Sequence, residues 1–260
     1  MILRPLQPSA PSQSKNELVP AWEVVQRTQS QKYQECWLIT QPSHAALAGE
    51  LAAKVSSPLL PNVENDLVRA IALHDAGWGV PDAQTIMRSR SVQKQLPESF
   101  IQVALAEYLA AWDKSIDVAQ SVSPAGGYIV SAHFCRIAES RLAAAPDRKQ
   151  DRSAVQKFLD DECKRQKKLA AKQAHTPKEL EQLTELLQFC DLLSLYMCCD
   201  AREKVVFPEY FGVTVRLVVE ESGYQFDPPL IERGARFSVA ALRHPATKEV
   251  SSQEMVIKVI

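Results

Sequence analysis

The stretch that decides the fold is residues 67 to 78, which read Leu-Val-Arg-Ala-Ile-Ala-Leu-His-Asp-Ala-Gly-Trp. Its apolar residues recur at the spacing of an amphipathic helix, and His74 and Asp75 continue the same stripe toward the interior. Burying an ionised carboxylate without a partner is costly, so Asp75 is expected to be hydrogen-bonded, ion-paired or bound to a cation. Gly77 is expected to end this helix with a positive φ.

His44 lies on the inner face of a second predicted helix, which runs from Thr40 to Val55. Thr40 is the expected N-cap, and Pro42 is tolerated in the first turn. Leucine and alanine residues three, four and seven positions after His44 share its face of the helix. The imidazole of His44 is therefore expected to point into the core.

Two further predicted helices each carry one polar residue on an apolar side. His133 has isoleucine and valine neighbours three and four positions away in the helix predicted from Tyr128 to Ala144. Asp191 falls in the middle of the leucine stripe of the helix predicted from Leu180 to Cys199. Thr176 opens that last helix with a capping-box pattern, which supports its position. The sequence thus predicts two more polar side chains inside the protein.

The rest of the chain divides by composition. Residues 1–19, rich in Pro, Ser and Gln, are expected to form a mobile N-terminal arm. Residues 20–204 are expected to form a helical domain that begins with a strand pair, Trp22 to Val25 and Cys36 to Thr40. Residues 205–260 are expected to be a β appendage packed on the same domain. Its strands are expected at residues 213–219, 236–242 and 255–259. The predicted class is mainly α, with a small antiparallel β-sheet that residues 21–40 can join, and α+β overall.

Charge and hydropathy exclude several classes of protein. Hydrophobic residues make up 46% of the 260 residues and charged residues 23%, as in ordinary globular proteins. A net charge of -1 gives no global attraction to nucleic acid or anionic lipid, and no clear nucleic-acid surface is predicted. No apolar run reaches the roughly 18 residues of a membrane span, and no signal peptide is visible, so we expect a cytoplasmic protein.

Two other features of the composition carry predictions. Residues 146–178 are dense in both charges and predict a long exposed helix or a helical hairpin with a solvated basic face. The six cysteines include no C-x-x-C pair and lie mostly among apolar neighbours. They are expected to be buried free thiols, not disulfides or zinc ligands.

The inward residues His44, His74, Asp75, His133 and Asp191 share one chemical property. Imidazole nitrogen and carboxylate oxygen together form the ligand set of Mn, Fe, Co or Ni, and Zn is also compatible, whereas Mg usually takes oxygen alone. A divalent cation would also compensate for the burial of two acids. We therefore predict one divalent transition metal. The alternative is a dry hydrogen-bonded network that holds no metal.

The order His, His-Asp, Asp along a helical segment resembles the HD-domain superfamily of metal-dependent phosphohydrolases. The phrases ITQPSHAALAGELA, HDAGW and FCDLLSLYMCC resemble more closely a bacterial family within it, catalogued as a domain of unknown function. This resemblance covers about residues 20–205. It implies an HD-domain-like helical bundle in which His44, His74, Asp75 and Asp191 bind one divalent metal.

The resemblance also implies a chemistry. A metal-activated water would attack a phosphomonoester, a nucleotide or a phosphodiester, with Asp75 orienting the water and Asp82 or His133 acting as general acid. His133 is the one additional histidine between the His-Asp pair and Asp191, so a mononuclear site is favoured, with His133 as a further candidate ligand. Candidates for phosphate contact by proximity are Arg69, Arg88, Arg90 and Arg136. The competing hypothesis is a catalytically inactive module that binds a ligand in the same pocket.

Overall fold

The computed structural model describes residues 1–7, 18–55, 63–90, 96–144, 149–220, 222–246 and 252–260. Its helices are α1 (Ala21–Gln29), α2 (Gln41–Lys54), α3 (Asn65–Ala72), the 3-10 turn η1 (Ala76–Trp78), α4 (Gly79–Ser89), the 3-10 turn η2 (Phe100–Gln102), α5 (Leu105–Val122), α6 (Pro124–Ala144), α7 (Lys149–Ala170) and α8 (Pro177–Cys198). Its strands are β1 (Ile2–Pro5), β2 (Val19–Pro20), β3 (Cys36–Ile39), β4 (Val205–Tyr210), β5 (Val213–Glu220), β6 (Gly223–Asp227), β7 (Arg236–His244) and β8 (Ser252–Lys258).

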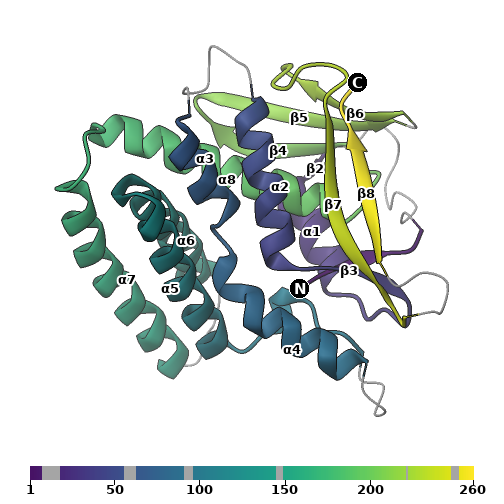
Figure 1. Cartoon of the computed structure of the whole chain (residues 1–260), viewed down its shortest axis with the longest axis horizontal. Helices are drawn as coiled ribbons and strands as arrows, with labels where there is room; N and C mark the ends of the chain where they lie inside the picture. The colour runs from purple at the N-terminus through teal and green to yellow at the C-terminus, as the bar shows by residue number, and fades with distance from the viewer. Residues whose placement is uncertain (8–17, 56–62, 91–95, 145–148, 221, 247–251) are drawn as a thin grey trace.

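Figure 1 shows α5, α6 and α7 on one side of the molecule and the strands on the other, with α2 and α8 between them. The predicted class, mainly α within an α+β protein, is confirmed. Among the helices that the structure describes, none combines the length and apolar character needed to cross a bilayer.

The strands form two small sheets instead of the one predicted. One sheet has the order β1-β3-β7-β8, with all neighbours antiparallel. The other has the order β2-β4-β5-β6, in which only the β2–β4 pair is parallel. The strands predicted near residues 213–219, 236–242 and 255–259 are found as β5, β7 and β8, while β4 and β6 were not predicted.

The prediction of a mobile arm over residues 1–19 is wrong for its first residues. Ile2 and Leu3 are fully buried, and β1 pairs with β3 so that Leu3 lies opposite Leu38. Four residues with two large apolar side chains are enough for a strand when a partner edge from a distant segment covers them, and composition alone does not reveal that edge. Residues 8–17 lie outside the described residues.

The predicted strand from Trp22 to Val25 is also wrong, because this segment belongs to helix α1. Val24, Val25 and Thr28 are buried, while Trp22 is 42% exposed, so the burial follows a helical period. The β propensity of valine depends on context, and here the buried and exposed residues of α1 alternate with the period of a helix. The second predicted strand of this pair is found as β3.

The two predicted helix starts are confirmed by their caps. The Thr40 hydroxyl oxygen accepts a hydrogen bond from the backbone N–H of Ser43 at 3.1 Å, and Pro42 lies in the first turn of α2. Thr176 and Glu179 form both hydrogen bonds of a capping box at the start of α8. From Leu180 onward α8 is buried on nearly every side, which is typical of a helix inside a core.

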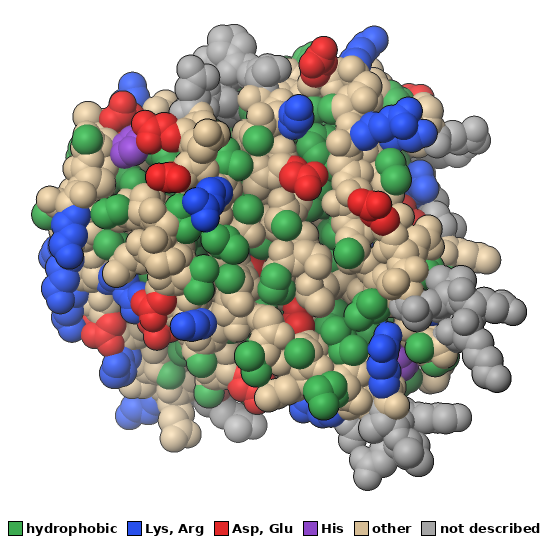
Figure 2. All heavy atoms as spheres, in the orientation of Figure 1, with side chains coloured by type: hydrophobic (Ala, Val, Ile, Leu, Met, Phe, Trp, Pro, Cys, Tyr) green, Lys and Arg blue, Asp and Glu red, His purple; other side chains and the backbone are tan. Residues whose placement is uncertain are grey.

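The charged segment contains one long helix, α7, and residues 145–148 before it lie outside the described residues. Arg165 on α7 forms ion pairs with Asp113 and Asp117 on α5 and with Glu162 on its own helix. These pairs tie α7 to α5. On the face drawn in Figure 2, basic side chains gather along the edge formed by α7, with acidic ones beside them.

The six cysteines are free thiols, as predicted, but the expected burial is wrong for Cys163. Cys36, Cys190, Cys198 and Cys199 are buried, whereas Cys135 is half-buried and Cys163 is exposed. Burial raises the pKa of Cys36 and of Cys199 to about 12. These thiols therefore behave as apolar side chains of the core, with little thiolate at neutral pH.

Helix α3 ends at Ala72, earlier than the apolar stripe indicates. His74 and Asp75 consequently lie in the turn between α3 and η1, and the backbone N–H of His74 donates to the carbonyl of Ile71. A turn changes the direction of the chain, so two adjacent side chains can both reach the interior. On a regular helix, adjacent side chains point about 100° apart.

The positive φ expected at Gly77 is not found. A glycine is required there because a side chain has no room. A Cβ atom on Gly77 would lie 2.0 Å from the carbonyl oxygen of Ala111 in α5. The backbone N–H of Gly77 also donates to the hydroxyl of Ser115 at 3.0 Å. The turn that carries His74 and Asp75 is thus pressed directly against the backbone of α5.

Replacing Gly77 with alanine should therefore lower the free energy of unfolding, by about 1–3 kcal/mol or more, because backbone atoms must move apart to admit the methyl group. Gly79 is a matched control, since an added Cβ there meets no atom within 4 Å. Gly79→Ala should be neutral or stabilising by up to about 1 kcal/mol. Urea unfolding of both variants tests this, and equal midpoints for Gly77→Ala and wild type would contradict it.

Candidate metal centre

Five polar side chains from distant parts of the chain meet in the interior. His44 comes from α2, His74 and Asp75 from the turn after α3, His133 from α6 and Asp191 from α8. They supply two overlapping sets of metal-ligand atoms, one from His44, His74 and Asp75 and one from His74, His133 and Asp191; within each set all atoms lie within 4.8 Å of one another. The structure thus brings together all five predicted ligands.

The ring of His44 is fixed by Ser194, one turn after Asp191 on α8. The hydroxyl of Ser194 donates to the carbonyl oxygen of Asp191 at 2.8 Å, so its oxygen is left to accept from Nδ1–H of His44 at 2.9 Å. With its proton on Nδ1, neutral His44 presents a lone pair at Nε2. That nitrogen lies 2.8 Å from Oδ2 of Asp75.

The ring of His74 is fixed in the same way by the backbone. Its Nδ1 lies 2.8 Å from the carbonyl oxygen of Ile71, which can only accept, so Nδ1 carries the proton. When the ring is neutral, Nε2 presents a lone pair 3.2 Å from Oδ1 of Asp191 and 3.8 Å from Oδ2 of Asp75. In both histidines an acceptor nitrogen faces carboxylate oxygens, which also accept. Such contacts require a cation between them, either a proton or a metal ion.

The pKa values of His74 and Asp191 also indicate that the cluster favours positive charge. Burial alone lowers the pKa of His74, but the charges of Asp75 and Asp191 and the hydrogen bond to Asp191 raise it to about 9. Burial likewise raises the pKa of Asp191, but the hydrogen bond and charge of His74 and the neighbouring histidines hold it at about 2. The cluster therefore binds a proton tightly, and its donor set equally suits a divalent cation.

His133 differs from the other two histidines. Its Nε2 lies 3.5 Å from Oδ2 of Asp191, and its buried Nδ1 has no hydrogen-bond partner among the described residues. Burial lowers the pKa of His133 to about 4, so its ring is neutral at neutral pH. His133 thus faces the cluster with a nitrogen that can serve as a ligand or exchange a proton.

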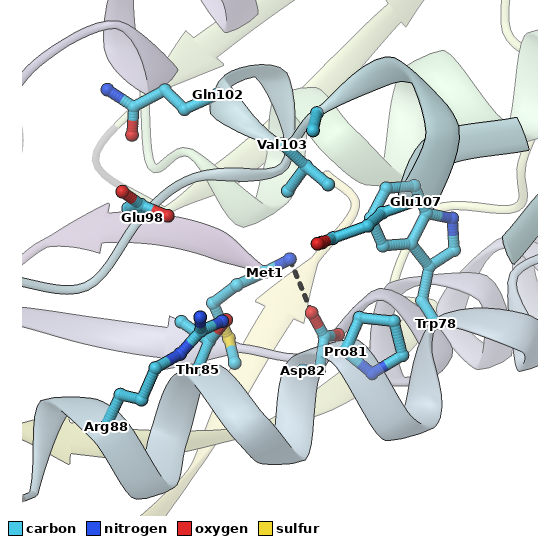
Figure 3. Close-up of a pocket in the computed structure, with 11 residues that line it drawn as sticks. Met1, Trp78, Pro81, Asp82, Thr85, Arg88, Glu98, Gln102, Val103 and Glu107 are labelled. Atoms are coloured by element: carbon cyan, nitrogen blue, oxygen red, sulfur yellow. Dashed lines mark hydrogen bonds and ion pairs between the residues drawn. The ribbon is translucent and has the colours of Figure 1, made fainter. Parts of the chain in front are cut away.

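Asp82 is not brought to the cluster. One of its carboxylate oxygens accepts from the amino group of Met1 at 2.6 Å, and the other accepts from the backbone N–H of Gln41 at 2.5 Å. Figure 3 shows the pairing of Asp82 with Met1, which lies at a cavity of about 230 Å³. Trp78 and Arg88 also line that cavity, and none of the five clustered residues does. The carboxylate that the sequence offers as a general acid therefore has other partners.

Several residues around the cluster were not predicted from the sequence. Ser194 could have been identified from the sequence, because it is a polar residue one turn from Asp191 inside an apolar helix. Tyr108 packs edge-on against Trp78 and Trp112, at ring distances of 4.7 and 4.9 Å. Burial and the charges of Asp75 and Asp191 raise the pKa of Tyr108, which places its hydroxyl in their electrostatic field. Nothing in the sequence near Tyr108 points to that location.

The fold and the cluster define a class: an α+β protein whose interior holds a set of histidine and aspartate side chains able to bind a metal ion. Residues 28–228 match the family described as Protein of unknown function (DUF3891). The match covers more than half of the chain, so the protein belongs to this family, as the sequence phrases predict. A search of the curated proteins found no match, and a search of the solved structures found none.

Replacing Ser194 with alanine should weaken metal binding by about 10- to 100-fold, the usual effect of losing a group that orients a histidine ligand. The fold should persist, because the change removes one oxygen atom. Ser121→Ala is the control, since that exposed serine donates to the carbonyl three residues earlier but holds no histidine. Competition with a chromogenic chelator measures the affinities, and equal values for both variants would contradict the assignment.

Proposed function

We propose that this protein is a metal-dependent phosphohydrolase. The observation that carries the proposal is the pair of histidine Nε2 atoms that face the carboxylates of Asp75 and Asp191 inside the protein, at 2.8 Å and 3.2 Å. Nitrogen and oxygen donors in this mixture suit Mn, Fe, Co, Ni or Zn. The resemblance of the His, His-Asp, Asp order to HD-domain phosphohydrolases supports the reaction class.

Four residues of the chain, His44, His74, Asp75 and Asp191, would hold one divalent cation. In the structure His44, His74 and Asp75 form one set of close ligand atoms, and Asp191 belongs to a second set with His74 and His133, so His133 could add a fifth donor. When bound, such a cation lowers the pKa of a water molecule and polarises a phosphoryl oxygen. The substrate class is a small phosphorylated molecule, which includes nucleotides.

Side chains of the protein would orient the attacking water and transfer its proton. Asp75, with one oxygen directed at His44, orients the attacking water through its carboxylate. His133 is neutral and faces the cluster, so its imidazole would accept the proton released by the attacking water, and the leaving oxygen would take its proton from solvent. Asp82 has no part in this proposal, because its two oxygens are bonded to Met1 and Gln41.

The test begins with the metal content of protein purified without chelators, followed by a screen of phosphomonoesters, nucleotides and phosphodiesters with added Mn, Fe, Co, Ni or Zn. We expect bound metal near one equivalent per chain and turnover that EDTA abolishes. Metal-free protein with no turnover under any cation would refute the proposal. Bound metal together with thermal stabilisation by nucleotides but without turnover would instead identify an inactive ligand-binding module.

Asp191→Asn should abolish both metal retention and turnover while leaving the fold intact. The amide keeps the shape of the side chain but removes the negative charge that the cation needs. Loss of a direct ligand should weaken metal binding by more than the about 10- to 100-fold expected when a group that only orients a ligand is lost. Asp160→Asn on the exposed face of α7 is the control. Elemental analysis of the two variants should separate them; full metal content in Asp191→Asn would exclude Asp191 as a ligand.

A further inference from the structure

The cluster meets solvent on the side of Asp191. The side chain of Asp191 is 13% exposed, whereas those of His44, His74, Asp75 and His133 are at most 9% exposed. Asp191 is thus the most exposed of the five clustered side chains, and the residues near it on α8 and on the elements packed beside them are the candidates for contact with a bound ligand.

Arg136 extends from α6 to α8 at this side. It lies one turn after His133, and its guanidinium donates to the amide oxygen of Gln188, one turn before Asp191, at 2.5 Å. A second donor is paired with Glu181. Two of the five N–H groups of the guanidinium are thus used within the described residues, and three are available to a ligand. The amide N–H groups of Gln188 also have no partner there.

Tyr210 is a further donor, within electrostatic reach of both Asp191 and Arg136. It ends β4 and packs against Phe189 on α8, with ring centroids 5.8 Å apart. The next residue, Phe211, has φ 56° and donates its N–H to Glu185, which fixes the hairpin against α8. Burial and the charge of Asp191 raise the pKa of Tyr210, while Arg136 opposes this shift. The hydroxyl therefore stays protonated and, among the described residues, it has no hydrogen-bond partner.

We propose that Arg136, Gln188 and Tyr210, which we call the donor rim, bind the non-bridging oxygens of a terminal phosphoryl group and thereby select phosphomonoesters over phosphodiesters. This inference rests on the proposed function. The three side chains are all half-buried donors that lie on α6 and α8 near His133 and Asp191 or on the strand packed against α8, and one of them is a cation.

The selectivity follows from the number of oxygens that a substrate offers. A terminal phosphoryl group has three non-bridging oxygens and a charge of about -1.5 to -2 at neutral pH. It can therefore face the cation site and the guanidinium fork together, and a guanidinium prefers to contact two oxygens at once. A phosphodiester has only two such oxygens and a single charge, so it cannot satisfy both sides equally well.

The experiment compares wild type, Arg136→Gln and Arg136→Lys, each loaded with metal, with Arg216→Gln as the control for loss of an exposed arginine on β5. Calorimetry measures binding of inorganic phosphate. Steady-state kinetics measure kcat/KM for 4-nitrophenyl phosphate and for bis(4-nitrophenyl) phosphate. Metal content is measured on every variant.

We expect Arg136→Gln to weaken phosphate binding by about 10- to 100-fold and to lower the monoester-to-diester ratio of kcat/KM at least about 10-fold, with metal content unchanged. Arg136→Lys should recover part of the loss, because it keeps the charge but not the fork.

An unchanged ratio and unchanged phosphate affinity in Arg136→Gln, or a diester preference in wild type, would overturn the inference while leaving the hydrolase proposal in place. Metal-bound wild type that fails to bind phosphate would overturn it as well. Metal-free, inactive wild type would overturn both.

Discussion

The structure depends on an unfavourable contact that only a cation can relieve. In their neutral forms the rings of His44 and His74 keep the proton on Nδ1, which donates to an oxygen outside the cluster, so that Nε2 of each ring faces carboxylate oxygens as an acceptor. In a buried site this arrangement of acceptors costs free energy unless positive charge lies between them. The cluster is therefore poised to hold a cation, and the surrounding helices keep it in that state.

The packing of the helices explains how the arrangement is held. Helix α8 is buried on nearly every side, so Asp191 and Ser194 cannot shift without moving the core. Gly77 lets the turn with His74 and Asp75 approach the backbone of α5 more closely than any other residue would permit. The cluster thus lies where rigid elements cross, which suits a site that must keep ligands in fixed geometry.

Asp82 has a structural role that its position in the sequence does not indicate. Its carboxylate accepts from Gln41 N–H, one of the unpaired backbone donors at the start of α2, and thereby links α4 to the helix that carries His44. An acid at a helix N-terminus is also favoured by the helix dipole. Proximity along the chain to His74 and Asp75 suggested a chemical role, but the carboxylate points to the start of α2.

The sequence by itself determined which polar side chains turn toward the interior. Helical periodicity is local, so His44, His133 and Asp191 could each be placed on an inner face, and five polar residues at such faces indicated a common site. Tertiary structure alone decided the rest. The proton positions depend on Ser194 and Ile71, the direction of Asp82 depends on Gln41, and β1 exists because β3 offers it an edge. These are contacts between distant or non-periodic segments, and local patterns carry no information about which distant group a side chain will meet.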